Sequence, residues 1–387
     1  MIELIQVKED ATMIYKDFQD LKLSQLGFGA MRLPVINGKD SDIDQDAVNE
    51  MVKVAMESGI NYFDTAWGYH GGNSEIAMGK ALSSYDRSSF YLADKFPGYD
   101  LSNMTKVREI FEKQLEKTGA AYFDFYLFHN VCEMNIDMYL DRSYGIYDYL
   151  MEQKKNGRIK HLGFSCHGEP DILQRFLDAY GDDMEFCQLQ LNYLDWTFQY
   201  GEKKVKMLSD RNIPVWVMEP LRGGKLVGLD PAFRERLDSS GRRESPQAWA
   251  FRFLQTIPET GVILSGMSDM EQLKDNINIF SEDRPLDGDE FDLLLSIADD
   301  MLGRKTIPCT GCSYCVSHCP MELDIPYLIS LYNEHAFTEG GFLAPMALAA
   351  LPDDKQPGSC VGCTSCEQVC PQNIKISEIM ADFADRL

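Results

Sequence analysis

Eight cysteines near the end of the chain form two runs with the same spacing, C-x-x-C-x-x-C-x-x-x-C-P. The first run starts at Cys309 and the second at Cys360, and a proline follows the fourth cysteine of each run. Thiolates at this spacing hold cubane iron–sulfur clusters, three from one run and the fourth from the other. The predicted ligands of one 4Fe–4S cluster are Cys309, Cys312, Cys315 and Cys370. Those of the other cluster are Cys360, Cys363, Cys366 and Cys319.

Other uses of such cysteines are a structural zinc ion, a redox thiol pair or disulfides. One isolated C-x-x-C would not distinguish these from a cluster. Two complete runs that share both a spacing and a proline favour clusters. Because iron–sulfur clusters carry single electrons, we expect the rest of the chain to exchange electrons with this segment.

Four titratable residues lie at the ends of neighbouring strand-like segments earlier in the chain. Asp64 and Tyr69 follow the second such segment. Lys95 lies within the third, and His129 closes the fourth. In a parallel barrel these strand ends meet at one face, where active sites are built. Taken singly, each residue has an ordinary structural interpretation, such as a helix cap or a hydrogen-bonded histidine.

Together the four side chains form an acid–base set suited to a carbonyl group. A free phenol has a pKa near 10, and an adjacent ammonium group lowers that pKa by favouring the phenolate. We therefore expect Lys95 to lower the pKa of Tyr69, and Asp64 to keep Lys95 protonated. His129 is expected to orient a carbonyl oxygen beside the Tyr69 hydroxyl and to stabilise the developing alkoxide.

These residues are carried by an alternation of strand-like and helical segments that repeats eight times, after a predicted N-terminal hairpin. Residues 46–58, 74–82 and 103–118 are examples of the helical segments. Such an alternation predicts an α/β fold, a (β/α)8 TIM barrel. The strand-like segments are 25–33, 60–66, 90–96, 122–130, 154–167, 186–195, 213–221 and 261–268.

A helix near residues 289–301 ends this alternation and leads into the cysteine runs. We place the domain boundary there, with residues 1–301 as the barrel and residues 302–387 as a second domain. The 40 residues between the two runs are more than a compact bacterial ferredoxin uses, and residues 325–335 and 341–351 within them are apolar and helical in pattern. The sequence therefore predicts a small, mainly α-helical ferredoxin-like domain.

Residues 20–280 resemble the aldo-keto reductase family. The resemblance is carried by the segments GINYFDTAWGYHGGNSE, YLADKF and DFYLFHN, which contain the four titratable residues. It implies that Asp64, Tyr69, Lys95 and His129 are the family's catalytic tetrad, in an iron–sulfur variant with a C-terminal two-cluster domain. It also implies an NAD(P)-dependent reaction in which hydride reaches a carbonyl carbon while Tyr69 protonates the oxygen.

The same resemblance implies a set of nicotinamide-cofactor residues. Ser165, Gln190 and Asn192 are implied near the carboxamide, and Met218 near the nicotinamide ring. The implied residues under the pyrophosphate are Pro220, Leu221, Arg222, Gly223, Gly224 and Lys225, and those on the adenosine side are Ser265, Gln272 and Asn276. A glycine-rich loop with two cations suits a phosphate, although glycines also mark ordinary flexible loops.

Two departures from the family leave the cofactor open. Met218 stands where the family usually stacks an aromatic residue on the nicotinamide. Between Ser265 and Asn276 there are three acids and only one cation, Lys274, so a 2′-phosphate would be poorly neutralised. NAD(H) is therefore at least as plausible as NADP(H). FMN is a further alternative, because nicotinamide transfers two electrons as hydride whereas each cluster accepts one.

The predicted function is that of an oxidoreductase that interconverts a carbonyl and an alcohol and is linked electronically to two 4Fe–4S clusters. The alternatives are a flavin-dependent reductase supplied by the clusters and a non-catalytic electron-transfer adaptor. Cys132, Cys166 and Cys187 are isolated and are interpreted as buried small side chains. Trp67 and Trp196 are expected either to line the substrate cleft or to pack in the core or at the rim of the barrel.

The composition bounds location and partners. The chain has 37 basic and 61 acidic residues, a net charge of −24, which disfavours nucleic acid and anionic membranes. Its mean hydropathy of −0.27 and its acidic start predict a soluble cytoplasmic protein with reduced thiols. The expected partners are a small carbonyl or alcohol substrate and an external electron carrier such as a ferredoxin. The acidic surface is interpreted as a means of keeping the protein soluble. A more specific alternative is that it docks to a partner with a basic face.

Overall fold

The computed structural model describes residues 12–387 of the chain. The chain divides into two compact units, one ending at Leu293 and the other beginning at Leu294. This division falls within helix α12, Gly288–Lys305, which also contains the boundary expected after residue 301. Where the functional domains separate within this helix stays a prediction.

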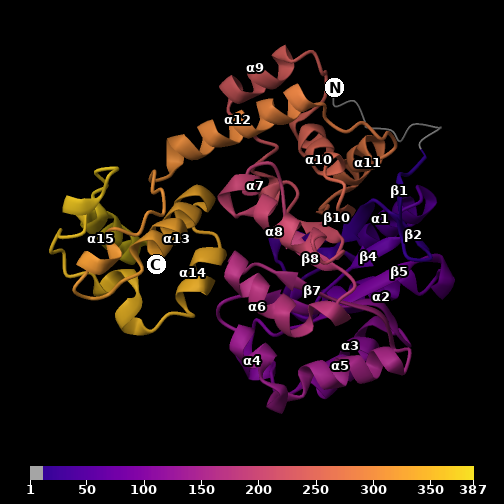
Figure 1. Ribbon diagram of the computed structural model, residues 1–387. Helices are drawn as coiled ribbons and strands as arrows, with labels where there is room; N and C mark the ends of the chain where they lie inside the picture. The colour runs from indigo at the N-terminus through magenta and orange to yellow at the C-terminus, as the bar shows by residue number, and fades with distance from the viewer. Residues whose placement is uncertain (1–11) are drawn as a thin grey trace. The chain divides into compact units, whose positions relative to one another are not determined.

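The first unit contains a closed barrel of eight parallel strands in sequence order, with β10 pairing back to β3. The predicted α/β barrel is therefore confirmed. In Figure 1 helices surround these strands. The strands are β3 Leu26–Gly29, β4 Tyr62–Asp64, β5 Tyr91–Phe96, β6 Phe123–Val131, β7 Ile159–Cys166, β8 Cys187–Gln190, β9 Val215–Met218 and β10 Thr260–Gly266.

Helices follow the strands along the chain, as the alternation predicts. Helix α1 shows why: Asp44 caps its N-terminus, and its buried residues Val48, Met51, Val52 and Ala55 recur at the spacing of one helical face. The helices of the first unit are α1 Gln45–Glu57, α2 Ser74–Leu82, α3 Val107–Thr118, α4 Ile136–Leu140, α5 Ile146–Lys155, α6 Pro170–Tyr180, α7 Asp195–Phe198, α8 Gly201–Ser209, α9 Pro231–Ser239, α10 Pro246–Thr256 and α11 Met270–Ile279.

A hairpin of β1, Tyr15–Phe18, and β2, Leu21–Ser24, precedes the barrel, as predicted. Its Phe18 and Leu23 belong to the same buried cluster as Tyr62, Phe125 and Trp216 from the barrel strands. The rings of Phe18 and Trp216 meet edge to face at 5.0 Å. This packing fills the end of the barrel opposite the strand ends that carry the titratable residues.

The second unit is helical around the two cysteine runs, which confirms the predicted class of this domain. Its helices after α12 are α13 Ile325–Thr338, α14 Leu343–Leu348 and α15 Ile376–Arg386. Leu328, Met380 and Phe383 from these helices form a buried core with Cys315 and Cys366. Two short 3-10 turns, Val316–His318 and Glu367–Val369, occupy equivalent places in the two runs.

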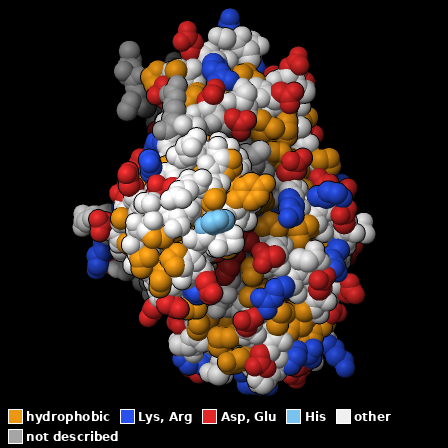
Figure 2. Space-filling model, turned by 60° about the vertical axis from the view of Figure 1, so that its left-hand side comes forward, with side chains coloured by type: hydrophobic (Ala, Val, Ile, Leu, Met, Phe, Trp, Pro, Cys, Tyr) orange, Lys and Arg blue, Asp and Glu red, His pale blue; other side chains and the backbone are white. Residues whose placement is uncertain are grey.

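Surface charge is spread on the face that Figure 2 shows, where acidic side chains lie among basic, hydrophobic and uncharged ones. On that face the acidic side chains are not gathered into one patch that could dock a basic protein. Scattered acidic charge of this kind repels polyanions in general. Among the described residues, every helix is too short or too polar to cross a membrane.

Candidate active site and cluster sites

Three of the four predicted catalytic residues form one hydrogen-bonded group at the end of β4 and β5. The Lys95 ammonium donates to Asp64 Oδ1 at 2.5 Å and to the Thr65 carbonyl at 2.8 Å. It also lies 3.4 Å from the Tyr69 hydroxyl. Lys95 points into the barrel and is completely buried. The structure thus brings the expected phenol, ammonium and carboxylate together.

His129 lies against the same phenol from the end of β6. Its ring meets the ring of Tyr69 at 6.2 Å and that of Tyr99 at 5.1 Å, both edge to face. Burial, Lys95 and His167 together hold the pKa of His129 well below its ordinary value, so its imidazole is neutral. Within the described part of the chain, His129 Nδ1 is buried without a hydrogen-bond partner.

The expected effect of Lys95 on Tyr69 is present but is outweighed. Burial raises the pKa of Tyr69, and the opposing pull of the Lys95 ammonium leaves it above its ordinary value. Burial alone would lower the pKa of Lys95, but the Asp64 carboxylate holds that pKa above its ordinary value. The resting phenol is therefore protonated. The expected lowering by Lys95 is present, but the cost of burying a phenolate, which the sequence does not show, outweighs it.

The segment that carries Tyr69 is fixed by the residue after it. The His70 backbone is left-handed, with φ 54°, and so is the glycine that follows. His70 Nε2 accepts from the Leu33 backbone N–H at 3.0 Å, and its Nδ1 lies 2.7 Å from the Asp40 carbonyl. This buried imidazole joins the segments after β3 and β4, so it positions Tyr69. No pattern in the sequence marks His70 for this role.

Behind Lys95 lies a second buried polar group. Asp94 and Glu75 are fully buried, and each has one carboxyl oxygen that no described hydrogen-bond donor reaches. Burial and the neighbouring Glu75 hold the pKa of Asp94 well above its ordinary value. Asp94 Oδ1 accepts from the Lys95 N–H and from Gln114 Nε2, each at 2.8 Å. Gln114 also donates to the Lys95 carbonyl at 2.9 Å, so this group holds the Lys95 peptide from both sides.

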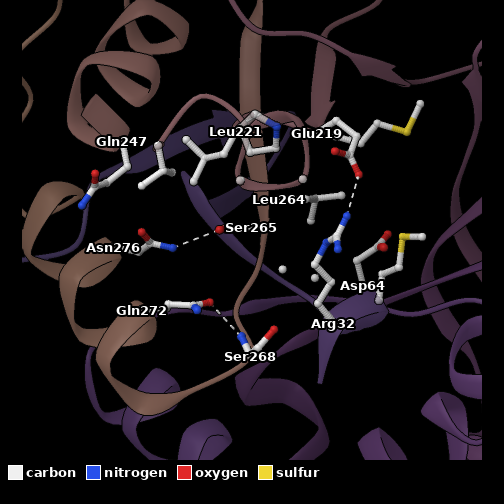
Figure 3. Close-up of a pocket in the computed structure, with 18 of the residues that line it drawn as sticks. Arg32, Asp64, Glu219, Leu221, Gln247, Leu264, Ser265, Ser268, Gln272 and Asn276 are labelled. Atoms are coloured by element: carbon white, nitrogen blue, oxygen red, sulfur yellow. Dashed lines mark hydrogen bonds and ion pairs between the residues drawn. The ribbon is translucent and has the colours of Figure 1, made fainter. Parts of the chain in front are cut away.

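A cavity of about 490 Å³ opens beside Asp64 and Tyr69, between the ends of β3, β9 and β10. Figure 3 shows side chains from these three strand ends pointing into it. Eight of the predicted cofactor residues line this cavity: Met218, Pro220, Leu221, Gly223, Gly224, Ser265, Gln272 and Asn276.

The side of the cavity formed by β10 and α11 is ordered by short hydrogen bonds. Asn276 Nδ2 donates to Ser265 Oγ at 2.9 Å, and the Ser268 N–H donates to Gln272 Oε1 at 3.0 Å (Figure 3). Asp269 caps α11 by accepting from the Gln272 N–H. These contacts pre-form a polar wall, to which the Asp275 carboxylate of α11 adds a negative charge.

The other five predicted cofactor residues are placed elsewhere. Arg222 is buried, and its Nε lies 3.1 and 3.2 Å from the two Asp195 carboxylate oxygens. Gln190 and Asn192 donate to the same carboxylate at 2.9 and 2.7 Å. Ser165 Oγ accepts from the Asn130 N–H at 2.7 Å, and Lys225 does not line the cavity. A buried carboxylate at Asp195 therefore holds three of these side chains.

Sequence reasoning missed several lining residues, of which Arg32 and Gln188 matter most. Arg32, at the end of the 3-10 turn that follows β3, lines the cavity, with its Nη2 3.7 Å from Glu219 Oε1 (Figure 3). A Cβ on Gly223 or Gly266 would meet its side chain at 3.2 Å, so these glycines make room for it. Gln188 lies opposite Ser165 in the sheet, and its Oε1 is buried without a partner among the described residues. Its place opposite Ser165, a predicted cofactor residue, was the signal that could have identified Gln188 as a lining residue.

The cluster cysteines gather as two quartets. One cavity, here called the first-cluster cavity, is lined by Cys309, Cys312, Cys315 and Cys370. The second-cluster cavity is lined by Cys319, Cys360, Cys363 and Cys366. These are the pairings predicted from the spacing. Among the described residues no group of three His, Cys, Asp or Glu is close enough to hold a single metal ion, whereas each quartet surrounds a space, which fits a cubane.

The remaining cysteines and tryptophans are accommodated by packing. Cys132, Cys166 and Cys187 are free and buried, and burial raises the pKa of Cys132 to about 11. Trp196 packs against Phe253 at 5.6 Å, and the Lys117 ammonium lies 4.4 Å from the Trp67 ring.

Comparison with known proteins decides the family. The model of the aldo/keto reductase family matches residues 25–299, and a 4Fe–4S dicluster domain model matches residues 308–375. The chain belongs to the aldo/keto reductase family. This confirms the resemblance, the enzyme class of aldo-keto-reductase-type oxidoreductases and the presence of the iron–sulfur domain.

Individual relatives support the same family. The chain is 26% identical over 229 residues to the NADH-specific methylglyoxal reductase of Escherichia coli, covering 54% of this chain and 67% of that protein. It is 26% identical over 287 residues to the L-galactose dehydrogenase of Arabidopsis thaliana, covering 68% of this chain and 86% of that protein. For an aldo-keto reductase of Glycine max, at 28% identity, the match spans 59% of that protein and 54% of this chain.

Solved structures support the fold. An aldo-keto reductase from Bacillus halodurans in its holo form superposes with a TM-score of 0.59 at 22% identity, covering 74% of this chain and 96% of that one. An aldo-keto reductase from Klebsiella pneumoniae in complex with NADPH superposes with a TM-score of 0.58 at 16% identity. The match covers 74% of this chain and 96% of that one. At these identities the likeness concerns the fold alone.

Proposed function

We propose that this protein interconverts a small carbonyl compound and its alcohol, with Tyr69 as proton donor, and that the reaction is linked to two 4Fe–4S clusters. The observation that carries the proposal is the Lys95 ammonium, which contacts both the Asp64 carboxylate and the Tyr69 hydroxyl beside a cavity large enough for a cofactor. A non-catalytic adaptor would have no need for this arrangement.

The cavity fits a nicotinamide dinucleotide. The polar wall of Ser265, Gln272 and Asn276 suits an adenosine, and Arg32 is the one cation among its described lining residues. The free Oε1 of Gln188 is an acceptor suited to a carboxamide NH₂. When bound, the nicotinamide would supply hydride.

NADH is the proposed form of the cofactor. Asp275 lines the cavity near the predicted adenosine side, where a 2′-phosphate would meet a carboxylate. One relative is named as NADH-specific, whereas another protein of the fold was solved with NADPH. None of the relatives named above is described as a flavin protein, and flavin is not proposed.

The residues of the chain supply the proton chemistry. In carbonyl reduction the Tyr69 hydroxyl donates its proton to the carbonyl oxygen, and the resulting phenolate is stabilised by the Lys95 ammonium 3.4 Å away. Asp64 keeps that ammonium charged. The neutral His129 imidazole, placed against Tyr69, is suited to donate a hydrogen bond to the same carbonyl oxygen.

The iron–sulfur domain would connect this chemistry to an external electron carrier such as a ferredoxin. Two clusters accept one electron each, so together they hold as many electrons as one hydride carries. The cytoplasmic location and the identity of the carrier stay predictions.

Anaerobic purification followed by cofactor assays tests the proposal. We expect about eight iron and eight sulfide per chain, no flavin released on heating, and tighter binding of NADH than of NADPH. We also expect NADH oxidation on addition of an aldehyde panel that includes methylglyoxal. Stoichiometric flavin, or no binding of either nicotinamide, would contradict it.

A further inference from the structure

The two cysteine runs belong to two halves of the iron–sulfur domain with a constant offset. Cys309 and Cys360 are 51 positions apart, since 360 − 309 = 51, and this offset holds for all four cysteines. Left-handed backbone recurs at the same offset. The pairs of residues with positive φ are Gly311 and Gly362, Ser313 and Thr364, and Glu322 and Asn373. The halves therefore share one backbone design, and differences between the two sites come from side chains.

Each cluster cavity is completed by the other half. The segment after Cys319 contributes Met321, Leu323 and Ile325 to the second-cluster cavity. The corresponding segment after Cys370 contributes Gln372, Ile374 and Ile376 to the first-cluster cavity. Residues at the 51-position offset can thus be compared directly as neighbours of one cluster or the other.

Two pairs of lining residues make the first-cluster cavity the more polar one, whereas Ser377 of the second-cluster cavity, with its counterpart Pro326 in the first, differs in the opposite sense. Thr310 lines the first-cluster cavity, whereas its counterpart Val361 lines the second. Gln372 lines the first-cluster cavity, whereas its counterpart Met321 lines the second. Hydroxyl and amide donors stabilise the added negative charge of a reduced cluster, and apolar side chains do not.

The charges differ in the same direction. Glu367 follows the ligand Cys366, and its counterpart beside Cys315 is Val316. The Glu367 side chain is only 13% exposed, and it accepts from the Ser377 N–H and Oγ–H at 2.9 and 2.5 Å. Ser377 itself lines the second-cluster cavity, so this carboxylate is held next to the second site. A held anion opposes the reduction of a neighbouring cluster.

Two further pairs add to this difference at the surface. Glu322 and Asp324 flank Leu323, which lines the second-cluster cavity, and their counterparts Asn373 and Lys375 flank Ile374, which lines the first. Lys375 also lies 3.8 Å from Glu367, but its side chain is 70% exposed, so water screens that attraction.

A hydrogen bond to a ligand sulfur also acts the other way. Ser365, whose counterpart is Tyr314, hydrogen-bonds the Cys363 sulfur through its backbone N–H and through its side chain. A donor to a ligand sulfur favours the reduced cluster. This contact favours reduction of the second cluster, whereas the Ser377 hydroxyl is already committed to Glu367. Both are set against the differences of polarity and charge described above.

We propose that the two clusters have unequal reduction potentials, and that the cluster bound by Cys319, Cys360, Cys363 and Cys366 has the lower one. In half-reduced protein the electron then resides on the cluster bound by Cys309, Cys312, Cys315 and Cys370. Within this domain electrons pass downhill from the second cluster to the first. The inference rests on the proposed ligand pairing.

A redox titration of the full-length holoprotein, followed by electron paramagnetic resonance, tests this order. We expect two separate reduction steps in protein that contains eight iron per chain. Glu367→Gln should raise the lower midpoint potential and leave the higher one unchanged. Thr310→Val should lower the higher midpoint only, and Val361→Thr should raise the lower one only.

Asp385→Asn is the matched control. It removes one carboxylate from α15 at a point nine residues beyond Ile376, about 13 Å along the helix axis, so neither midpoint should move. A single step of two electrons, or a Glu367→Gln shift of the higher step, would overturn the inference. Iron content of about four per chain would instead overturn the ligand pairing beneath it.

Discussion

The Lys95 ammonium and the Asp64 carboxylate form a 2.5 Å ion pair inside the barrel, where their side chains are 0% and 3% exposed. A buried pair of this kind is costly to break, because the remaining partner is left as an uncompensated charge. The pair therefore serves the reaction and also has a measurable effect on folding.

Replacing Lys95 by methionine should reduce turnover by about 10²–10⁴-fold, because the Tyr69 phenolate loses its stabilising charge. It should also lower the free energy of unfolding by about 3–5 kcal/mol, because Asp64 stays buried without a partner. Urea denaturation of the single variant and of the double variant with Asp64→Asn measures this. If the double variant is no more stable than Lys95→Met, the pair is not the cause.

The pH dependence should follow the raised pKa of Tyr69. Carbonyl reduction requires the protonated phenol, so its rate should stay high through neutral pH and fall only above the ordinary phenol pKa near 10. Alcohol oxidation requires the phenolate, so its rate should rise over the same range. Steady-state rates in both directions from pH 6 to 11 provide the measurement, and a reduction rate that already falls below pH 8 would contradict the assignment.

Asp94 should bind its proton more tightly in the folded protein than in the unfolded chain, because its pKa is raised by burial and by Glu75. The folded state then binds a proton that the unfolded state releases, so this carboxyl group favours folding less as pH rises from about 4. Asp94→Asn keeps the hydrogen bonds and removes the titration. We expect it to stabilise the protein more at pH 8 than at pH 5, as measured by urea denaturation at both values.

Glu75→Gln is the comparison for that variant. Glu75 forms an ion pair with Lys117, so removing its charge should destabilise the protein at both pH values. An equal pH dependence of the two substitutions would show that the raised pKa of Asp94 is not the cause of the pH effect.

Arg32 should bind a phosphate of the cofactor after leaving Glu219. Arg32→Gln should weaken NADH binding about tenfold, a modest loss for one charge-assisted hydrogen bond at a half-exposed site. Glu219→Gln should leave binding equal or tighter, because it frees the guanidinium. Fluorescence titration with NADH gives both affinities, and unchanged binding by Arg32→Gln would remove Arg32 from the site.

Cys363→Ala should remove the second cluster and spare the first. Iron content should fall from about eight to about four per chain, with loss of one reduction step. Cys166→Ala, at a buried cysteine outside the runs, should leave the iron content unchanged. Loss of all iron from Cys363→Ala at retained far-UV circular dichroism would contradict independent sites.

The sequence predicted the barrel, and it predicted that Asp64, Tyr69 and Lys95 lie together, because each signal is local. A strand end places Asp64 or Lys95 with little freedom, and cysteine spacing alone predicted both quartets. The cofactor residues were harder, because their side chains choose between partners distant in sequence. Arg222, Gln190 and Asn192 turn to Asp195, a residue whose burial no local pattern reveals.

The pKa of Tyr69 could not be predicted for a related reason. Its sign depends on the balance between the burial of the phenol and its distance from Lys95, and only the folded structure contains both quantities. Arg32 was missed because it lies beyond the end of β3, outside the loops after β9 and β10 where the cofactor was expected.

Turnover by the Tyr69→Phe variant tests the central claim most directly. Aldehyde reduction by NADH should fall by at least about 10²-fold, while NADH affinity stays within about twofold and iron stays near eight per chain. Aldehyde reduction at the rate of the unaltered protein, with the same cofactor and iron content, would show that the phenol beside Lys95 is not the proton donor.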